Sequence, residues 1–265
     1  MGQLDGKGVV VTGAGRGIGR ALATRAAAEG GRVVVNDLDA DNARAVAAEI
    51  GGTAVPGDAA SPEGVAALVE EATATLGRVD VYFANAGIDG AGGAHSLQAS
   101  DEVWERVLDV NVMAHIRAAR ELVPRWLEDG QGGRFVVTAS AAGLLTMIGS
   151  APYSVTKHAA VGFAEWLSVT YGARGVDVHA ICPQGVRTQM LEEAGGLQSL
   201  LSRDSALEPE QVADAVMTAI AEGRFLVLPH PEVAGYYVAR ATDTDRWLGG
   251  MRRLQQKVDE SGALS

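Results

Sequence analysis

Cysteine, lysine and long apolar runs are scarce in this chain of 265 residues. The single cysteine, Cys182, excludes a disulfide within the chain and the cysteine clusters of structural zinc sites. No apolar run approaches the 18 or so residues of a membrane-spanning helix, so we expect no membrane partner. The first residues lack the apolar core of a signal peptide, which favours a cytoplasmic location.

Positive charge is also in short supply. The net charge of −11 argues against a nucleic-acid partner, because such proteins present a basic face to phosphates. Of the 22 basic residues only three are lysines, namely Lys7, Lys157 and Lys257. None of the five histidines has a partner at metal-ligand spacing, so we expect no metal site.

The sequence does contain a regular alternation of short apolar runs and longer alanine-rich stretches. The expected strands are residues 8–12, 32–36, 53–56, 79–84, 134–138, 176–181 and 224–228. The expected helices are about 17–30, 39–49, 62–77, 100–129, 152–173 and 208–223. Nearly continuous apolar strands are typical of sheets covered on both faces. The pattern predicts an α/β, doubly wound Rossmann fold, with about seven parallel strands and helices on both faces.

Three segments interrupt this rhythm, but no linker or internal repeat divides the chain, so we expect a single domain over residues 1–265. Residues 89–96 form a glycine-rich loop, and residues 188–205 carry apolar side chains that suit a lid over a substrate. Residues from about 230 to 265 form a tail with a helical apolar stripe. That stripe packs either on its own domain or on a neighbouring subunit.

A glycine-rich turn follows the first expected strand and opens the first expected helix. Gly13, Gly17 and Gly19 permit a tight turn and a close approach of backbone to a pyrophosphate. The helix N-terminus offers free N–H groups to the same anion. An ordinary tight turn is the alternative, but the position inside a strand–helix–strand unit favours a dinucleotide site.

The second strand ends at Asp37, 18 residues after Gly19, where a carboxylate can accept hydrogen bonds from both ribose hydroxyls of the adenosine. A carboxylate repels the 2′-phosphate of NADP, whereas Arg16 in the glycine turn is able to pair with it. We give Asp37 more weight and predict NAD as the cofactor, with NADP second. The alternative role of Asp37 is to cap the next helix, for which Asp39 is equally suited.

Further motifs follow in order along the chain. They are Asp58 after the third strand, Asn85-Ala86-Gly87 after the fourth, Asn111, Ser140, Tyr153-xxx-Lys157, and Pro183 to Thr188. With Thr12-Gly13-xxx-Gly17-Ile18-Gly19 they resemble the compact short-chain dehydrogenase/reductase (SDR) family over about residues 5–230. One departure is Gln184, which stands where the family usually has glycine.

Tyr153 and Lys157 are four residues apart, so on a helix they share a face. A solvated surface pair is the alternative, but lysine is rare here and, unlike arginine, can relay a proton. A nearby ammonium and the charge of an oxidised nicotinamide favour the phenolate, so we expect a lowered tyrosine pKa. Tyr153 can then take a proton from an alcohol while hydride leaves for the nicotinamide, or return it to a ketone.

The resemblance implies roles for the other residues. Ser140 holds the substrate oxygen, and Asn111 sits at a helix irregularity that supports a water-mediated proton relay from Lys157; alone, they read as a strand-end turn serine and a helix-surface amide. The implied catalytic residues are Asn111, Ser140, Tyr153 and Lys157. The implied cofactor-binding residues are Gly13, Arg16, Gly17, Ile18, Gly19, Asp37, Asp58, Asn85, Ala86, Gly87, Tyr153, Lys157, Pro183, Val186 and Thr188.

These residues predict an NAD(P)-dependent alcohol dehydrogenase or ketoreductase acting on an uncharged, mainly apolar secondary alcohol or ketone. The alternatives are an NADP-dependent ketoreductase and a cofactor-sensing homologue without enzymatic activity. The resemblance also implies a homotetramer or homodimer paired through the helices at 100–129 and 152–173.

Overall fold

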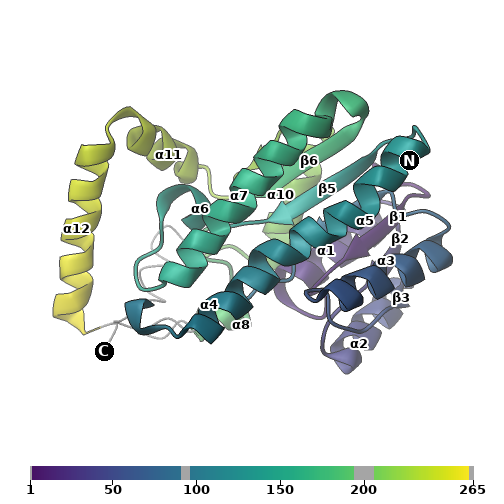
Figure 1. Ribbon diagram of the computed structural model, residues 1–265, viewed down its shortest axis with the longest axis horizontal. Coiled ribbons are helices and arrows are strands. Elements are labelled where there is room, and N and C mark those ends of the chain that lie inside the picture. The colour runs from purple at the N-terminus through teal and green to yellow at the C-terminus, as the bar shows by residue number, and fades with distance from the viewer. Residues whose placement is uncertain (1, 91–95, 194–205, 263–265) are drawn as a thin grey trace.

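The computed structural model describes residues 2–90, 96–193 and 206–262. Within these residues, seven parallel strands form one sheet in the order β3-β2-β1-β4-β5-β6-β7 (Figure 1). The strands are β1 (Gly8–Val11), β2 (Arg32–Val35), β3 (Thr53–Ala54), β4 (Val81–Ala84), β5 (Gly133–Thr138), β6 (Val176–Ile181) and β7 (Leu226–Val227). The doubly wound Rossmann arrangement predicted from the sequence is confirmed.

Helices connect the strands and cover the sheet. They are α1 (Gly17–Ala28), α2 (Ala40–Ile50), α3 (Pro62–Leu76), α4 (Asp101–Leu108), α5 (Ala114–Glu128), α6 (Ala142–Leu145), α7 (Ala151–Tyr171), α8 (Gln189–Glu192), α10 (Pro209–Ala221), α11 (Glu232–Thr242) and α12 (Thr244–Ser261). Local chemistry fixes several starts. Asp39 caps α2 through its carboxylate, and the Ser61 hydroxyl caps α3 with Pro62 in the first helical position.

The long helix expected over residues 100–129 is interrupted. A π-helical turn at Asp109–Met113 separates α4 from α5, and the Ala114 N–H reaches back five residues to the Asp109 carbonyl. Such insertions are rare and occur often at functional sites, because they turn side chains out of the regular helical register. The irregularity that the family resemblance implied near Asn111 is therefore present.

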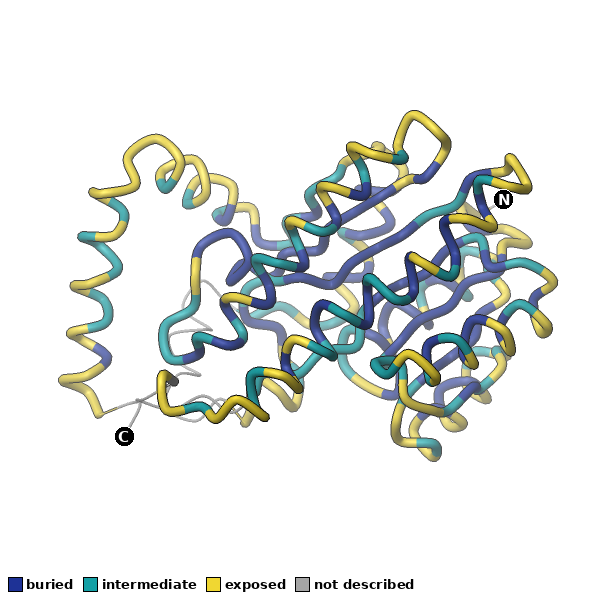
Figure 2. Tube along the Cα trace, viewed as in Figure 1, coloured by how far each residue is buried: buried dark blue, intermediate teal, exposed yellow. Residues whose placement is uncertain are grey.

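Two apolar layers hold the sheet between its helices (Figure 2). One layer joins the sheet to α3, α5 and α7, and the other joins it to α1, α2 and α10. Neighbouring residues of β1 face opposite layers, since Val10 lies in the first layer while Val9 and Val11 lie in the second. Each such valine stabilises the fold by about 1.5–3 kcal/mol when fully buried.

The C-terminal helices α11 and α12 extend from the side of the molecule, and most of their residues are exposed (Figures 1 and 2). Arg240 of α11 connects them to the body, because its guanidinium donates to the Leu144 carbonyl at the end of α6 and lies 3.2 Å from His158 Nε2 on α7. Trp247 of α12 packs against the layer that contains α7. Among the helices described, none combines the length and hydrophobicity that crossing a bilayer requires.

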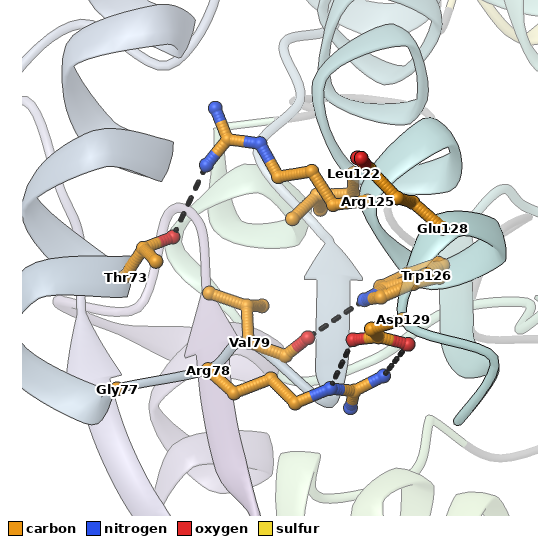
Figure 3. A pocket seen from close by; sticks show the side chains of 9 residues that line it. All are labelled: Thr73, Gly77, Arg78, Val79, Leu122, Arg125, Trp126, Glu128 and Asp129. Atoms are coloured by element: carbon orange, nitrogen blue, oxygen red, sulfur yellow. Dashed lines mark hydrogen bonds and ion pairs between the residues drawn. The ribbon is translucent and has the colours of Figure 1, made fainter.

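A pocket of about 260 Å³ lies beside the start of β4 and the end of α5 (Figure 3). Its polar groups are already paired: Trp126 Nε1 donates to the Val79 carbonyl at 2.7 Å, and Arg78 binds Asp129 at 2.8 Å. This pocket is at the amino ends of the strands, on the opposite edge from the motifs described above. We therefore do not assign the cofactor or substrate to it.

Candidate active site

The predicted site residues come together at the carboxyl edge of the sheet. Asp37 follows β2, Asn85 follows β4, Ser140 follows β5 and Pro183 follows β6. The connections from the two central strands, β1 and β4, lead to helices on opposite faces of the sheet. Open α/β sheets bind ligands at such a switch point.

Gly19, at the end of the glycine turn, has no room for a side chain. A Cβ on Gly19 would lie 2.1 Å from the Gly13 carbonyl oxygen and 2.6 Å from Asn85 Nδ2, which real structures do not show. Arg16 occupies the N-cap position of α1, but its side chain makes no capping hydrogen bond to the N–H groups of the first turn. Open N–H groups at a helix start are suited to a pyrophosphate. The Arg16 side chain instead donates to Gln189 at the start of α8.

Asp37 lies next to this turn. Its Oδ2 accepts the Gly15 N–H at 2.8 Å and its Oδ1 accepts the Asp39 N–H at 3.0 Å. The capping role falls to Asp39, whose Oδ1 accepts from both Asp41 and Asn42 at 3.0 Å, so the alternative role considered for Asp37 is wrong. The half-buried Asp37 carboxylate is therefore fixed beside the glycine turn.

Asp58 follows the short strand β3. Burial opposes its ionisation, but hydrogen bonds from the Ser61 side chain and from the backbone N–H groups of Ala60 and Ser61 lower the pKa overall. The Asp58 carboxylate is thus ionised at neutral pH and fixed at the sheet edge.

Asn85 braces the central strands. Its Nδ2 donates to the Thr12 carbonyl at 2.9 Å, and its Oδ1 accepts the Thr138 hydroxyl at 3.0 Å. The Thr12 hydroxyl in turn accepts the N–H groups of Asn85 and Ala86, both at 3.0 Å. One amide and two hydroxyls therefore tie β1, β4 and β5 together next to the glycine turn.

Ser140, Tyr153 and Lys157 form a contiguous group. The Ser140 side chain lies close enough to the Tyr153 hydroxyl to lower its pKa, and Lys157 Nζ lies 5.5 Å from the centre of the Tyr153 ring. Lys157 is only 3 % exposed, and its ammonium donates to the Thr138 carbonyl at 2.9 Å. This is not a solvated surface pair, because the lysine is buried and held by the backbone of β5.

Burial dominates the electrostatics of this group. It raises the pKa of Tyr153 to about 12; the Ser140 hydrogen bond opposes this shift, and the nearby Asp89 and Cys182 add to it. Burial lowers the pKa of Lys157 to about 8. The lowered tyrosine pKa expected from the sequence included the charge of an oxidised nicotinamide, so it stays a prediction for the protein with cofactor bound; without that charge, desolvation of the phenol raises the pKa.

Asn111 lies in the π-turn and is fully buried. Its Oδ1 accepts the Ile88 N–H and its Nδ2 donates to the Ile88 carbonyl, both at 2.9 Å, while Nδ2 also lies 3.1 Å from the Thr156 hydroxyl. A Cβ on Gly87 would lie 3.3 Å from both Asn111 Oδ1 and Lys157 Nζ. Asn111 is therefore no surface amide: it joins the loop after β4 to the helix that carries Tyr153 and Lys157.

The segment after β6 comes back to the glycine turn. The Pro183 carbonyl accepts the Ala141 N–H at 2.8 Å, next to Ser140. The N–H of Gln184, the residue that departs from the family pattern, donates to His230 Nδ1 at 3.1 Å. A Cβ on Gly17 would meet the Thr188 methyl at 3.1 Å, so Thr188 lies against the cofactor turn, while Val186 is buried beside it.

Parts of the predicted lid and loop are outside the described residues, namely 194–205 and 91–95. Of the remaining lid residues, Leu191 is buried and Met190 is exposed. Leu144 and Leu145, which follow Ser140, belong to the core. Cys182 is a buried thiol just after β6. In the part of the chain that the structure describes, no cluster of three or more metal-ligating side chains is found.

Sequence reasoning missed three polar residues around this site. The Thr138 carbonyl holds Lys157, the Thr156 hydroxyl contacts Asn111, and the charge of the Asp89 carboxyl is near enough to raise the pKa of Tyr153. Only Asp89 had a signal in the sequence, because it is an acid two residues after Gly87 at a strand end. A backbone carbonyl has no sequence signal of its own.

Comparison with known proteins supplies the remaining findings. A family model described as short chain dehydrogenase matches residues 7–196. The chain is 35% identical to a 1-deoxy-11-beta-hydroxypentalenate dehydrogenase of Streptomyces exfoliatus, over 87% of this chain and 85% of the relative. It is 36% identical to a 2,5-dichloro-2,5-cyclohexadiene-1,4-diol dehydrogenase of Sphingobium indicum, over 79% and 82%. A crystal structure of an SDR protein from Burkholderia phymatum in complex with NAD superimposes with a TM-score of 0.84, at 30% identity, over 92% of this chain and 96% of that one.

Proposed function

The chain belongs to the short-chain dehydrogenase/reductase family, and on that premise we propose that it is an NAD-preferring dehydrogenase of uncharged, mainly apolar secondary alcohols, or the corresponding ketone reductase. The observation that carries this proposal is the group formed by half-buried Ser140 and Tyr153 with buried Lys157 at the sheet edge, next to the glycine turn. A tyrosine hydroxyl, a serine hydroxyl and an ammonium in one such group are suited to moving a proton at a carbinol oxygen.

In alcohol oxidation, Tyr153 accepts the hydroxyl proton as the carbinol C–H bond breaks, and Ser140 holds the oxygen through its hydroxyl. In ketone reduction, Tyr153 returns the proton to the same oxygen. The oxidised nicotinamide, when bound, takes up the hydride and adds a positive charge that favours the Tyr153 phenolate. Burial lowers the pKa of Lys157 to about 8, which suits proton exchange near neutral pH.

Asn111 and Lys157 supply the route by which that proton leaves the site. Both lie within reach of Gly87, whose missing side chain leaves space between them. We propose that a water held in the π-turn by Asn111 accepts a proton from Lys157, as the family resemblance implies. Asn111 therefore acts on the lysine and does not touch the reacting carbon.

The residues at the glycine turn fit a dinucleotide. A pyrophosphate would be held by the turn of Gly13, Gly17, Ile18 and Gly19 and by the first N–H groups of α1, where any Cβ on Gly19 would clash. The fixed Asp37 carboxylate favours NAD, because it binds ribose hydroxyls and repels a 2′-phosphate. We assign Asp58 to the adenine, Asn85, Ala86 and Gly87 to the ribose side, and Pro183, Val186 and Thr188 to the carboxamide.

The substrate class follows from the surroundings of Tyr153 and from the relatives. Met147 and Ile148 are half-buried on the segment between Ser140 and Tyr153, and Ser154 holds that segment through the Met147 N–H at 2.9 Å. The two relatives described above are named as dehydrogenases of hydroxylated compounds.

We also propose one domain over residues 1–265, a cytoplasmic location, and a homotetramer or homodimer.

Replacing the acid/base tests this function directly. The Tyr153→Phe variant should bind NADH with a Kd within about twofold of wild type, because it loses one hydroxyl, yet lose at least about 10³-fold in turnover, a range typical of general acid–base catalysis. Turnover is followed as reduced-nicotinamide absorbance with a panel of cyclic secondary alcohols. Tyr171→Phe, at the other end of α7, is the matched control and should retain activity.

Near-normal turnover by Tyr153→Phe would contradict the catalytic assignment. Tight NADH binding by wild type without turnover of any alcohol or ketone would instead support the cofactor-sensing alternative.

A further inference from the structure

The loop after β4 brings one acidic side chain to the catalytic group. Asp89 is two residues beyond Gly87, and none of the roles proposed above uses it. Its Oδ1 atom is buried and has no hydrogen-bond partner among the residues that the structure describes. A buried polar atom without a partner costs about 1–3 kcal/mol, and more when it is charged.

Both neighbours of Asp89 are fixed in place. The N–H and carbonyl groups of Ile88 are each bound to the Asn111 amide at 2.9 Å. Gly90 has a φ of +80°, and a Cβ there would lie 2.4 Å from Val107 Cγ2, so only glycine lets the loop pack this closely on α4. The position of the Asp89 carboxyl is therefore set by anchors on both sides.

Ser150 joins the backbone of Asp89 to the backbone of Tyr153, which holds the loop after β4 against the start of α7. The Ser150 hydroxyl lies 3.5 Å from the Asp89 carbonyl oxygen and accepts the Tyr153 N–H at 3.4 Å. Burial raises the pKa of Asp89, a hydrogen bond from Ser150 partly opposes that shift, and Asp89 in turn raises the pKa of Tyr153. The Asp89 carboxyl is thus near enough to Tyr153 to affect its ionisation, in the region that the reacting alcohol must also enter.

We propose that Asp89 is a substrate-recognition residue, and that its free carboxylate oxygen accepts a hydrogen bond from a second hydroxyl group on the substrate. This proposal rests on the proposed function and narrows its substrate to secondary alcohols that carry another hydroxyl near the reacting carbon, such as cyclic diols. The second hydroxyl satisfies the free oxygen of Asp89 while Tyr153 and Ser140 hold the first.

A hydroxyl suits this position better than an ammonium group. Lys157 already brings one positive charge to the buried group, and the oxidised cofactor brings a second. A cationic substrate would add a third charge to a desolvated site, which is costly. A neutral hydroxyl satisfies the carboxylate without that cost.

Matched pairs of substrates test the proposal in the full-length protein with NAD. Cyclohexanol is compared with the 1,2-, 1,3- and 1,4-cyclohexanediols and with 2- and 4-aminocyclohexanol. Wild type should show kcat/KM at least about tenfold higher for one of the diols than for cyclohexanol, as expected for a hydrogen bond to a charged group. Asp89→Ala should remove this preference while keeping the Kd for NADH within about twofold, with the kcat/KM ratio of diol to cyclohexanol compared at the pH where each protein is most active.

A pH profile separates recognition from a merely structural role. Because the Asp89 charge raises the Tyr153 pKa, Asp89→Asn should move the pH limb that reports Tyr153 ionisation to lower pH. Asp101→Asn, an exposed acid at the start of α4, is the control and should move neither the pH limb nor the substrate preference.

The outcomes distinguish the two proposals. Turnover of cyclohexanol and diols at equal efficiency would overturn the recognition role of Asp89 while leaving the dehydrogenase assignment standing. A preference for the amino alcohols would also overturn it, in favour of a cationic ligand. Absence of turnover on every alcohol, with intact NADH binding, would count against the proposed function itself.

Discussion

At the scale of single residues, the site depends on charged side chains that are partly or fully buried and are each held by hydrogen bonds to the backbone. Lys157 is fixed by one backbone carbonyl, and Asp37 is fixed by two backbone N–H groups. Charge-assisted hydrogen bonds of this kind are about twice as strong as neutral ones, so these side chains stay in place without a ligand. Such preorganisation reduces the reorganisation that catalysis requires.

We propose that cofactor choice depends on one such residue, Asp37. The Asp37→Ala variant should raise the ratio of kcat/KM with NADP to that with NAD by about 10- to 100-fold. The variant loses charged hydrogen bonds to the ribose, worth about 1.5–3 kcal/mol, and no longer repels a 2′-phosphate. Initial rates with both cofactors measure the ratio.

Asp39→Ala provides the matched control for that experiment. It removes the α2 cap and should cost about 1 kcal/mol of stability without changing the cofactor ratio. If wild type already prefers NADP, Arg16 rather than Asp37 determines the choice.

At the scale of elements, the most informative feature is the π-turn at Asp109–Met113. The hydrophobic spacing around it is that of one continuous helix, so residues 100–129 were predicted as a single element. Within the turn, Asn111 bonds to the backbone of Ile88, more than twenty residues earlier in the chain. Local patterns do not encode such a distant contact; here only the family resemblance indicated it.

Loss of the Asn111 amide should therefore destabilise the fold as well as the reaction. Asn111→Ala leaves the N–H and carbonyl of Ile88 without their partner, so the free energy of unfolding should fall by about 2–4 kcal/mol. Chemical denaturation measures this difference. Gln255→Ala, an exposed amide on α12, should change it by less than about 0.5 kcal/mol.

A similar stability for Asn111→Ala and wild type would show that water replaces the amide. In that case, the loop after β4 is not anchored by Asn111.

At the scale of the whole molecule, the sheet and its covering helices were predictable because their apolar periodicity is strong. All seven strands are found at the predicted positions among the described residues, with ends shifted by up to two residues. The tail was less predictable, since the same apolar stripe suits packing on its own domain or on another subunit. The structure places Trp247 against the core and leaves Leu248 42 % exposed.

The exposed face of α7 bears on assembly. Val155, Trp166 and Val169 are 51 %, 53 % and 80 % exposed, although apolar side chains of this size are usually buried. We expect wild type to elute as a multiple of the 27.4 kDa chain, and Trp166→Glu to elute at a lower mass. Size-exclusion chromatography with light scattering measures both.

Leu248→Glu on α12 serves as the comparison and should leave the mass unchanged. If Leu248→Glu rather than Trp166→Glu reduces the mass, the tail forms the subunit interface.

The hydrogen bonds between the Asn111 side chain and the Ile88 backbone have a consequence for protein engineering. The loop after β4, the π-turn at Asp109–Met113 and α7 are joined through the Asn111 amide and the Thr156 hydroxyl. If the loop after β4 were replaced by that of a relative, its contacts with Asn111 would be lost. We expect the position of Lys157 on α7 to change as a result. A transferable unit must therefore comprise residues 85–90 with Val107, Asn111 and Thr156, although these are distant in sequence.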